Sequence, residues 1–281
     1  MAVRYALQEA FDHFGVKYKI IKSDQEFDRE SLAAYDMVLL DSWTWAAKGW
    51  VPKRNIVGHE SKIFILDFFG AKSLRNHGMN LSPRRFLTAF PSVGNTFLGY
   101  YIPPTTGNFS HSKLNRGIIW GKDVNHFDHR HDLLNFVASL SPLVSTSSQS
   151  IPHLHRNIEW KGHQTPQSWK LLLQSSKFLL GLGHPLMGPS ALDAISQGCM
   201  YLNPIYSQPF LREQTKLSYT SQHPYVADTI GSPYVCSFHL DRRAELKQCV
   251  EAALASNLPP FIPNDFTKVA YFTRVQKIFD L

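Results

Sequence analysis

A glycine-rich loop between a strand-like and a helix-like segment carries the clearest chemical signal in the sequence. An apolar run over 177–183 ends at Gly183, and Gly188 and Pro189 open a short helical pattern. Backbone N–H groups at the start of a helix, together with the helix dipole, favour a bound phosphate. Asp193, one turn into this helix, offers a carboxylate to ribose hydroxyls. The spacing matches neither G-x-G-x-x-G nor the P-loop pattern, so an ordinary turn that caps a core helix stays an alternative.

Three further charged residues end the most apolar runs of the chain. Lys122 ends GIIWGK, where it could face the phosphates of a ligand on the glycine-rich loop, or simply be a solvated surface lysine. Asp41 and Asp67 end the runs 35–41 and 62–67, which are typical of buried parallel strands. A carboxylate at the carboxyl end of a strand could act as a general base or orient a substrate. It could equally cap a helix or shape a turn.

The elements that must position these residues alternate between strand and helix patterns, which predicts α/β architecture with parallel sheets. The first run has a helical face on Leu7, Ala10, Phe11 and Phe14. Strands are then expected over 16–21, 35–41, 62–67 and 96–102, and a helix over 83–90. In the second run we expect strands over 117–122, 177–183, 200–204 and 233–238, and helices over 133–140, 167–176, 189–198, 243–255 and 266–279.

A segment rich in Pro, Ser and Thr, residues 103–116, separates the two runs and is expected to be a linker. The sequence therefore predicts two lobes, 1–112 and 113–281, the second ending in the helix 266–279. Open parallel sheets bind ligands outside the carboxyl ends of their strands. In a two-lobed chain that rule predicts a ligand in the cleft between the lobes.

Composition narrows the class of protein. The chain has 281 residues, 43% of them hydrophobic and 18% charged, with a net charge of +7. No basic run stands out, which argues against a nucleic-acid partner. The three cysteines, 199, 236 and 249, form no CxxC pair, which argues against a closed zinc site and allows at most one intramolecular disulfide. The apolar stretches are far shorter than the roughly 20 residues of a membrane-spanning helix, so the chain as given is expected to be soluble.

Two blocks of the sequence resemble glycosyltransferase family 18: LGLGHPLMGPSALDAISQGCMYLNP, residues 180–204, and TSQHPY, residues 220–225. Less specific blocks corroborate the resemblance in the same order along most of the chain. They are ILDFFG (65–70), NLSPRRFLTAFP (80–91), FLGYY (97–101), GIIWGK (117–122) and PFIPNDFT (260–267).

The resemblance implies a GT-B-like fold, in which two Rossmann-like lobes with parallel sheets enclose a cleft. It implies an inverting, metal-independent transfer of GlcNAc from UDP-GlcNAc to the 6-hydroxyl of an α-1,6-linked mannose on an N-glycan. The expected partners are therefore UDP-GlcNAc and an N-glycan or glycoprotein, with no metal cofactor. The expected location is the Golgi lumen, if the chain is part of an anchored protein.

The same resemblance assigns roles along this chain. It implies that the donor lies in the second lobe at Lys122, Gly183, Gly188, Pro189 and Asp193. Lys216 is the nearest match to a loop lysine of the family, with a local deletion. Met187 stands where the family usually has glutamate, and a thioether does not accept two hydroxyl hydrogen bonds as a carboxylate does.

The acceptor is expected against the first lobe, near Asp41 and Asp67. The catalytic glutamate implied by the resemblance aligns just before Met1, so Asp67 is the nearest substitute base within the sequence. Together with Met187, this leaves an alternative function: a catalytically degenerate sugar-nucleotide or glycan-binding module on the same fold.

Overall fold

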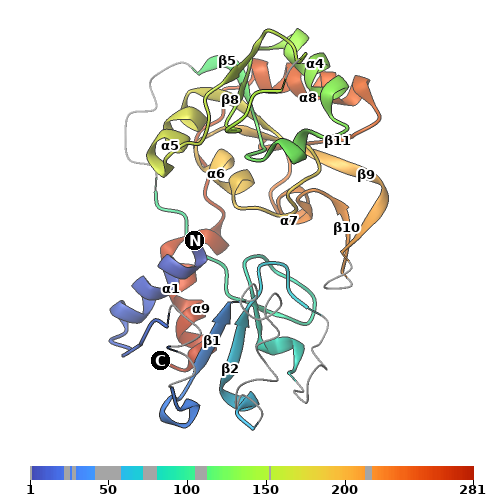
Figure 1. Cartoon of the computed structure of the whole chain (residues 1–281). Coiled ribbons are helices and arrows are strands. Elements are labelled where there is room, and N and C mark those ends of the chain that lie inside the picture. The colour runs from blue at the N-terminus through green and yellow to red at the C-terminus, as the bar shows by residue number, and fades with distance from the viewer. Residues whose placement is uncertain are drawn as a thin grey trace. The chain divides into compact units, whose positions relative to one another are not determined.

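The computed structural model describes residues 2–21, 26, 30–41, 58–71, 81–104, 113–151, 153–212 and 217–281. The chain divides into two compact units, each with its own sheet (Figure 1). Unit 1 comprises Met1–Tyr101, Arg212–Leu217 and Asn264–Leu281, and unit 2 comprises Ile102–Leu211 and Ser218–Pro263.

Unit 1 is built on a parallel sheet in the order β1-β2-β3-β4. Its strands are β1 (Val38–Asp41), β2 (Ile63–Leu66), β3 (Phe86–Thr88) and β4 (Thr96–Phe97), and its short 3-10 turns are η1 (Leu32–Ala34), η3 (Glu60–Lys62) and η4 (Pro83–Arg85). Ile63 and Ile65 are completely buried in β2, in one core with Phe86 of β3. The apolar runs that end at Asp41 and Asp67 are therefore parallel strands, as predicted.

Three local predictions in unit 1 are wrong. The expected helix 83–90 is the turn η4 followed by β3, because Ser82 and Pro83 start only one turn and the next residues join the sheet. The expected strand 16–21 forms no ladder. In the expected strand 96–102 only Thr96–Phe97 pairs, since Gly99, at a φ of 72°, turns the chain out of the extended conformation.

The helix predicted over 266–279 belongs to unit 1 and not, as predicted, to the second lobe. Helix α9 (Lys268–Phe279) follows the 3-10 turn η6 (Asn264–Phe266) and packs against α1 (Ala2–His13). The Phe279 ring lies 5.5 Å from the Phe11 ring and 5.5 Å from the Phe64 ring, measured between centroids. Lys268 pairs with Glu9 at 2.6 Å. These contacts join residues that are far apart in the sequence, and they explain why α9 belongs to unit 1.

Unit 2 contains a larger sheet whose strands β7-β6-β5-β8-β9-β11 are all parallel to their neighbours along this path. They are β5 (Leu114–Ile119), β6 (Leu143–Ser145), β7 (Ile158–Trp160), β8 (Ser176–Leu180), β9 (Met200–Arg212) and β11 (Val235–His239), and β10 (Leu217–Ser221) also neighbours β9. When the six strands of this path, without β10, are numbered in chain order, the path is 3-2-1-4-5-6, which is the strand order of a Rossmann sheet. Both units thus confirm the predicted α/β class with parallel sheets.

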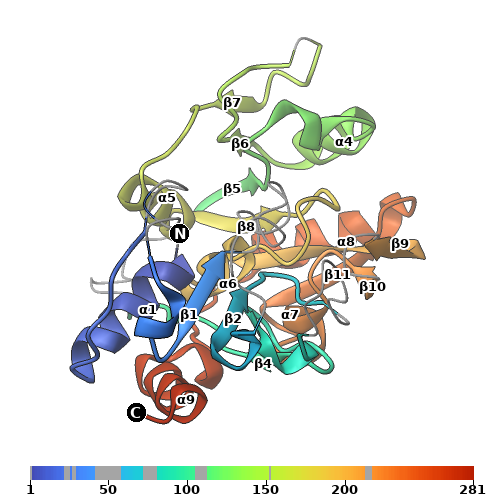
Figure 2. The same ribbon diagram turned by 60° about the horizontal axis from the view of Figure 1, so that its bottom comes forward.

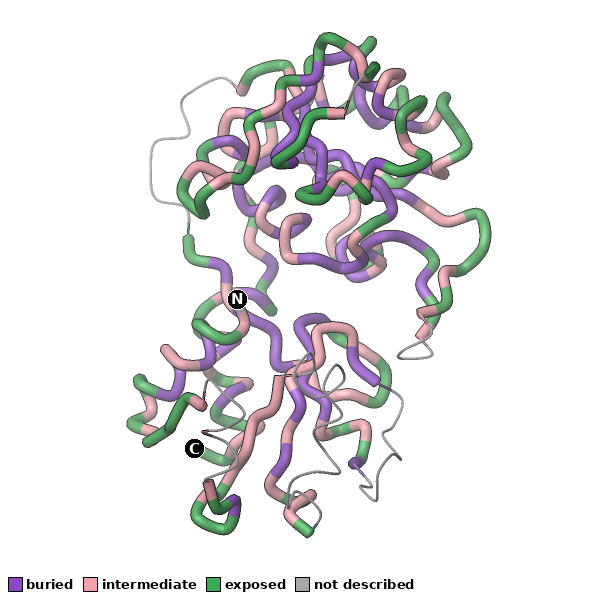
Figure 3. Tube along the Cα trace, in the orientation of Figure 1, coloured by how far each residue is buried: buried purple, intermediate pink, exposed green. Residues whose placement is uncertain are grey.

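Helices cover both faces of the unit 2 sheet (Figure 2). They are α4 (His131–Leu140), α5 (Pro166–Gln174), α6 (Ser190–Ser196), α7 (Pro224–Thr229) and α8 (Arg243–Ala255), with the 3-10 turn η5 (Val124–Phe127) before α4. Helices α4 and α8 share one core with Phe178 and Leu180 of β8, whereas α5 and α6 pack against each other and against β8 without joining that core. Alternate residues of a strand point to opposite faces, so α5 and α6 cover the other face. The strands between are the most buried part of this unit (Figure 3).

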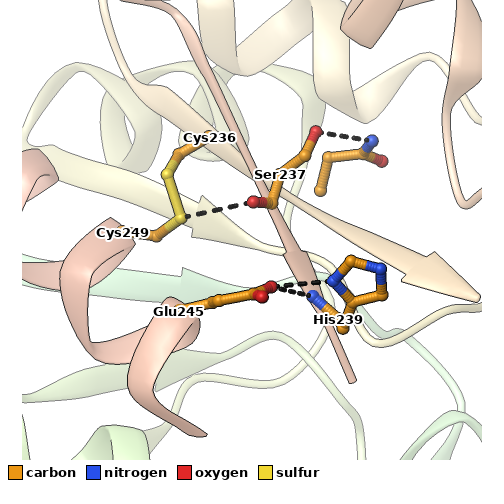
Figure 4. Close-up of a disulfide and its surroundings, with 6 residues drawn as sticks. Cys236, Ser237, His239, Glu245 and Cys249 are labelled. Carbon is orange, nitrogen blue, oxygen red and sulfur yellow. Dashed lines mark hydrogen bonds and ion pairs between the residues drawn. A yellow bond between two sulfur atoms is a disulfide. The ribbon is translucent and has the colours of Figure 1, made fainter. Parts of the chain in front are cut away.

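Cys199 is buried and is a free thiol. A disulfide joins Cys236 of β11 to Cys249 of α8 (Figure 4). Near the disulfide, Glu245 of α8 accepts hydrogen bonds from the backbone N–H of His239, at 2.9 Å, and from Arg242, at 2.9 Å. Strand β11 is thus joined to the first half of α8 by a covalent bond and by hydrogen bonds to a charged group. Among the helices of the described residues, none has the length and apolar character needed to span a membrane.

Candidate functional site

The predicted donor residues meet at one point of the unit 2 sheet. Strands β5 and β8 are parallel neighbours, but the chain leaves β5 toward α4 on one face and leaves β8 toward α6 on the other. Such a reversal of direction opens a crevice at the carboxyl ends of the two strands, where α/β proteins bind ligands. Lys122 follows β5, and the 181–189 loop follows β8, so both lie at this reversal.

The two predicted glycines of the 181–189 loop each have a geometric reason. Gly183 has a φ of 92°, a conformation that other residues adopt only with strain. A Cβ on Gly188 would lie 2.6 Å from Cζ2 of Trp120, the residue directly after β5. The loop backbone therefore packs against the end of β5 as closely as only glycine allows.

One expectation about this loop is wrong. The Gly183 N–H was expected to be exposed for a phosphate, but it donates instead to Oε1 of the buried Gln222, at 2.9 Å. The Gln222 side chain also donates from Nε2 to the Pro185 carbonyl, at 2.9 Å, and the Gln222 carbonyl accepts from the Met187 N–H, at 2.9 Å. Gly183 therefore contributes only its backbone conformation to the loop. The N–H groups at the start of α6, from Ser190 on, remain the candidates for binding an anion.

Two more side chains fix the other edge of the loop. The Tyr206 hydroxyl donates to the Gly183 carbonyl at 2.6 Å, and Nε of Arg130 donates to the Leu182 carbonyl at 2.8 Å. None of Tyr206, Arg130 and Gln222 was predicted from the sequence as a site residue. Only Gln222 had a signal, because it lies within the TSQHPY block that resembles family 18.

Asp193 and Lys122 supply opposite charges at this point. Burial raises the pKa of Asp193 to about 6, against the weaker lowering effects of Trp169, whose Nε1 donates to Oδ2 at 3.4 Å, and of the Lys122 charge. Pro189 is the N-cap residue of α6 and provides no side-chain cap to its N–H groups. The structure thus brings together Lys122, Gly183, Gly188, Pro189 and Asp193, whereas Lys216 lies outside the described residues.

Met187 occupies the position that the resemblance associates with glutamate. Its side chain is buried, and its backbone has a φ of 45°, in the left-handed region. The Met187 N–H is held by the Gln222 carbonyl. The residue therefore contributes apolar packing to the loop and no oxygen ligand.

Asp41 and Asp67 lie at the carboxyl ends of the neighbouring strands β1 and β2 of unit 1. Asp67 shapes the turn after β2, since its Oδ1 accepts from the N–H groups of Phe69, at 2.9 Å, and Gly70, at 3.1 Å. Burial raises the pKa of Asp67, opposed by these hydrogen bonds and by the charge of Arg212. Asp41 forms a salt bridge with Arg4 at 2.9 Å. The two carboxylates share one sheet edge, each with a structural partner.

The 181–189 loop itself contains a histidine, His184. The pKa of His184 is lowered by burial and by the charges of Arg130 and His126. Within the described residues, no three His, Cys, Asp or Glu side chains gather in a way that could hold a metal ion.

Comparison with known proteins agrees with the sequence blocks described above. The family model of glycosyltransferase family 18 matches residues 54–280. The chain is 28% identical over 257 residues to alpha-1,6-mannosylglycoprotein 6-beta-N-acetylglucosaminyltransferase A of Cricetulus griseus, covering 80% of this chain and 34% of that protein. It is 24% identical over 252 residues to the B enzyme of Homo sapiens, covering 77% and 32%. The chain thus spans about a third of the length of these curated relatives.

Solved structures give weaker likenesses. A putative UDP-N-acetylglucosamine 2-epimerase from Listeria monocytogenes aligns at a TM-score of 0.42 and 10% identity, covering 99% of this chain and 79% of that one. The glycotransferase of kitacinnamycin aligns at a TM-score of 0.37 and 13% identity, covering 78% and 50%. At these TM-scores the likenesses carry no argument about the site.

Proposed function

Because the chain belongs to glycosyltransferase family 18, we propose that it transfers GlcNAc from UDP-GlcNAc to the 6-hydroxyl of an α-1,6-linked mannose on N-glycans. The names of its curated relatives describe an alpha-1,6-mannosylglycoprotein 6-beta-N-acetylglucosaminyltransferase, which supports this substrate pair. The reaction is proposed to proceed with inversion and without a metal ion.

The observation that carries the proposal is the meeting of Lys122 with the 181–189 loop and α6 at the reversal point of a Rossmann-ordered sheet. The UDP pyrophosphate would lie against the start of α6, with the Lys122 ammonium beside it. The Asp193 carboxylate would accept hydrogen bonds from the ribose hydroxyls. When the bond between the sugar and UDP breaks, backbone N–H groups and Lys122 would stabilise the negative charge that forms on the leaving phosphate.

Inversion requires that the mannose 6-hydroxyl attack the anomeric carbon from the face opposite UDP while a carboxylate takes its proton. We propose Asp67 for this role, with Asp41 beside it at the same sheet edge. Burial raises the pKa of Asp67, which makes its carboxylate a stronger base. Asp41 would orient the acceptor through its ion pair with Arg4.

The Cys236–Cys249 disulfide supports a lumenal location. Disulfides persist in the oxidising secretory compartments and are rare in the reducing cytosol. The bond links two core elements of unit 2, so the folded chain would keep it in an oxidising compartment. We therefore propose that the protein works in the Golgi lumen.

Met187 favours a second candidate function, a catalytically degenerate module that binds a sugar nucleotide or a glycan. Its buried thioether provides no hydroxyl acceptor at a position where the family usually has a carboxylate. Of Met187 and Asp193, only Asp193 would then offer a carboxylate to the nucleoside.

Calorimetric titration with UDP-GlcNAc, with UDP-galactose as the comparison, tests the donor site. Selective binding is expected, and Asp193→Ala should weaken it at least tenfold. Asp228→Ala, a change of an exposed aspartate on α7, is the matched control and should leave binding unchanged. If the folded chain binds neither nucleotide at millimolar concentration, the result refutes both the GlcNAc-transferase function and the sugar-nucleotide-binding function.

Transfer of radiolabelled GlcNAc to a mannose-terminated N-glycan separates the enzyme from the binding module. Transfer that Asp67→Asn abolishes supports the enzyme and the proposed base. Binding of UDP-GlcNAc without transfer supports the module.

A further inference from the structure

We propose that Gln222 is a positioning residue that holds the 181–189 loop in its ligand-binding conformation. This inference rests on the proposed function, because it concerns the same donor site. Gln222 lies 33 residues after Pro189 in the sequence, on the segment between β10 and α7. Its side chain is completely buried.

The Gln222 amide bridges the loop. Its Oε1 accepts from the Gly183 N–H and its Nε2 donates to the Pro185 carbonyl, each at 2.9 Å. These bonds fix both ends of the turn around residue 184. A glutamine is needed for this, since leucine has neither group and glutamate has no donor for the Pro185 carbonyl.

The loop is shaped to receive this side chain. A Cβ on Gly181 would lie 2.3 Å from the Gln222 Oε1, so glycine is required there. The Gln222 main chain continues the connection, because its carbonyl accepts from the Met187 N–H at 2.9 Å. One residue therefore holds the loop backbone at positions 183, 185 and 187.

Gln222 is itself anchored to the sheet. Its N–H donates to the Pro204 carbonyl of β9 at 2.8 Å. The next residue, His223, donates from its N–H to Oδ1 of the buried Asn203, at 3.0 Å, and Asn203 in turn donates to Oγ of Ser237 on β11, at 3.3 Å. The loop is thus fixed relative to the rigid strands β9 and β11 rather than to another loop.

This arrangement accounts for the pairing of the two sequence blocks. Residues 180–204 form the loop, α6 and the start of β9, and residues 220–225 supply the side chain and backbone that hold the loop. If the loop shifted, the start of α6 and Asp193 would move with it. The Gln222 side chain therefore sets the donor geometry without touching the donor.

The test compares Gln222→Leu with Gln197→Leu as a matched control. Gln197 is also a buried glutamine of unit 2, but its amide contacts Ser196 and Gln174 beyond the last turn of α6. Hydrogen exchange of the loop amides is measured on the free protein, and UDP affinity is measured by calorimetry. Gln222→Leu should speed exchange at residues 183–187 at least tenfold and weaken UDP binding at least tenfold, while Gln197→Leu changes neither.

Unchanged loop exchange in Gln222→Leu, or an equal effect of Gln197→Leu, overturns the inference. The exchange experiment needs no ligand, so it decides on Gln222 even if the wild-type chain fails to bind UDP, which would refute only the proposed function. If Gln222→Leu does not fold, Gln222→Glu answers the same question, because it keeps the acceptor for Gly183 and removes the donor to Pro185. It should speed exchange near Pro185, and wild-type exchange there would overturn the inference.

Discussion

Replacing Cys236 and Cys249 with alanine removes the covalent bond between β11 and α8. The bond closes a loop with a sequence separation of 13. In the loop-closure model, opening a loop of this size adds enough entropy to the unfolded chain to cost about 3 kcal/mol of folding stability. For a unit of this size, that loss lowers the melting temperature by roughly 6 to 12 °C.

The assay is denaturant unfolding of the oxidised wild-type chain, the double variant and the two single variants. Either single variant already breaks the bond, so each should lose nearly as much stability as the double variant rather than half of it. A reducing agent is the control, since it should lower the stability of the wild type by a similar amount and leave the double variant unchanged. A loss below about 1 kcal/mol, or equal sensitivity of both proteins to the reductant, would refute the reasoning.

Three further predictions follow from unit 2. Gly188→Ala places a Cβ 2.6 Å from Trp120, which should cost about 1–3 kcal/mol by overpacking and shift the tryptophan fluorescence, and an unchanged unfolding midpoint would contradict this contact. Asp193 has its pKa raised to about 6, so the folded state binds its proton more tightly and the stability due to this group falls as pH rises from about 4 through 6. Asp193→Asn should therefore flatten the thermal stability profile over this range, and an unaltered profile would contradict the raised pKa. Glu245 has its pKa lowered to about 2 by hydrogen bonds from His239 and Arg242, so its stabilising effect is present above its ordinary pKa of 4.5 and is lost as pH falls through 2. Glu245→Gln should lower the melting temperature at pH 7 more than at pH 2, and equal losses at both values would count against these bonds.

The parts of the fold that the sequence predicts are those with a strong local signal. The helix 243–255 has the predicted bounds, and the runs that end at Asp41 and Asp67 are strands, because apolar runs and periodic faces are properties of neighbouring residues. The segment 83–90 carries a helix-like pattern that is overruled by pairing of β3 with β2 and β4. Such pairing depends on residues distant in the sequence, which local periodicity does not report.

The candidate site divides in the same way. The glycines and Asp193 were predicted from one short segment, in which a glycine-rich loop lies between a strand pattern and a helix pattern. Gln222 was missed as a functional residue because its partners, Gly183 and Pro185, lie 39 and 37 residues away in the sequence. The cysteine pairing was left open for a similar reason, since three cysteines allow three pairings and only the packing of α8 on β11 selects one.

Because of helix α9, unit 1 has all its residues only after unit 2 has been synthesised, although most of unit 1 precedes unit 2 in the sequence. Unit 1 includes residues 1–101 and also residues 264–281, which the ribosome adds after every residue of unit 2. Until then Phe11 and Phe64 lack the Phe279 ring that packs against them, whereas every residue of unit 2 has already been synthesised. Domains generally fold as units when their residues are available, so unit 2 is expected to fold first during translation. Residues 1–101 would meanwhile expose apolar surface to chaperones, and a nonsense mutation before residue 264 would remove the C-terminal part of unit 1.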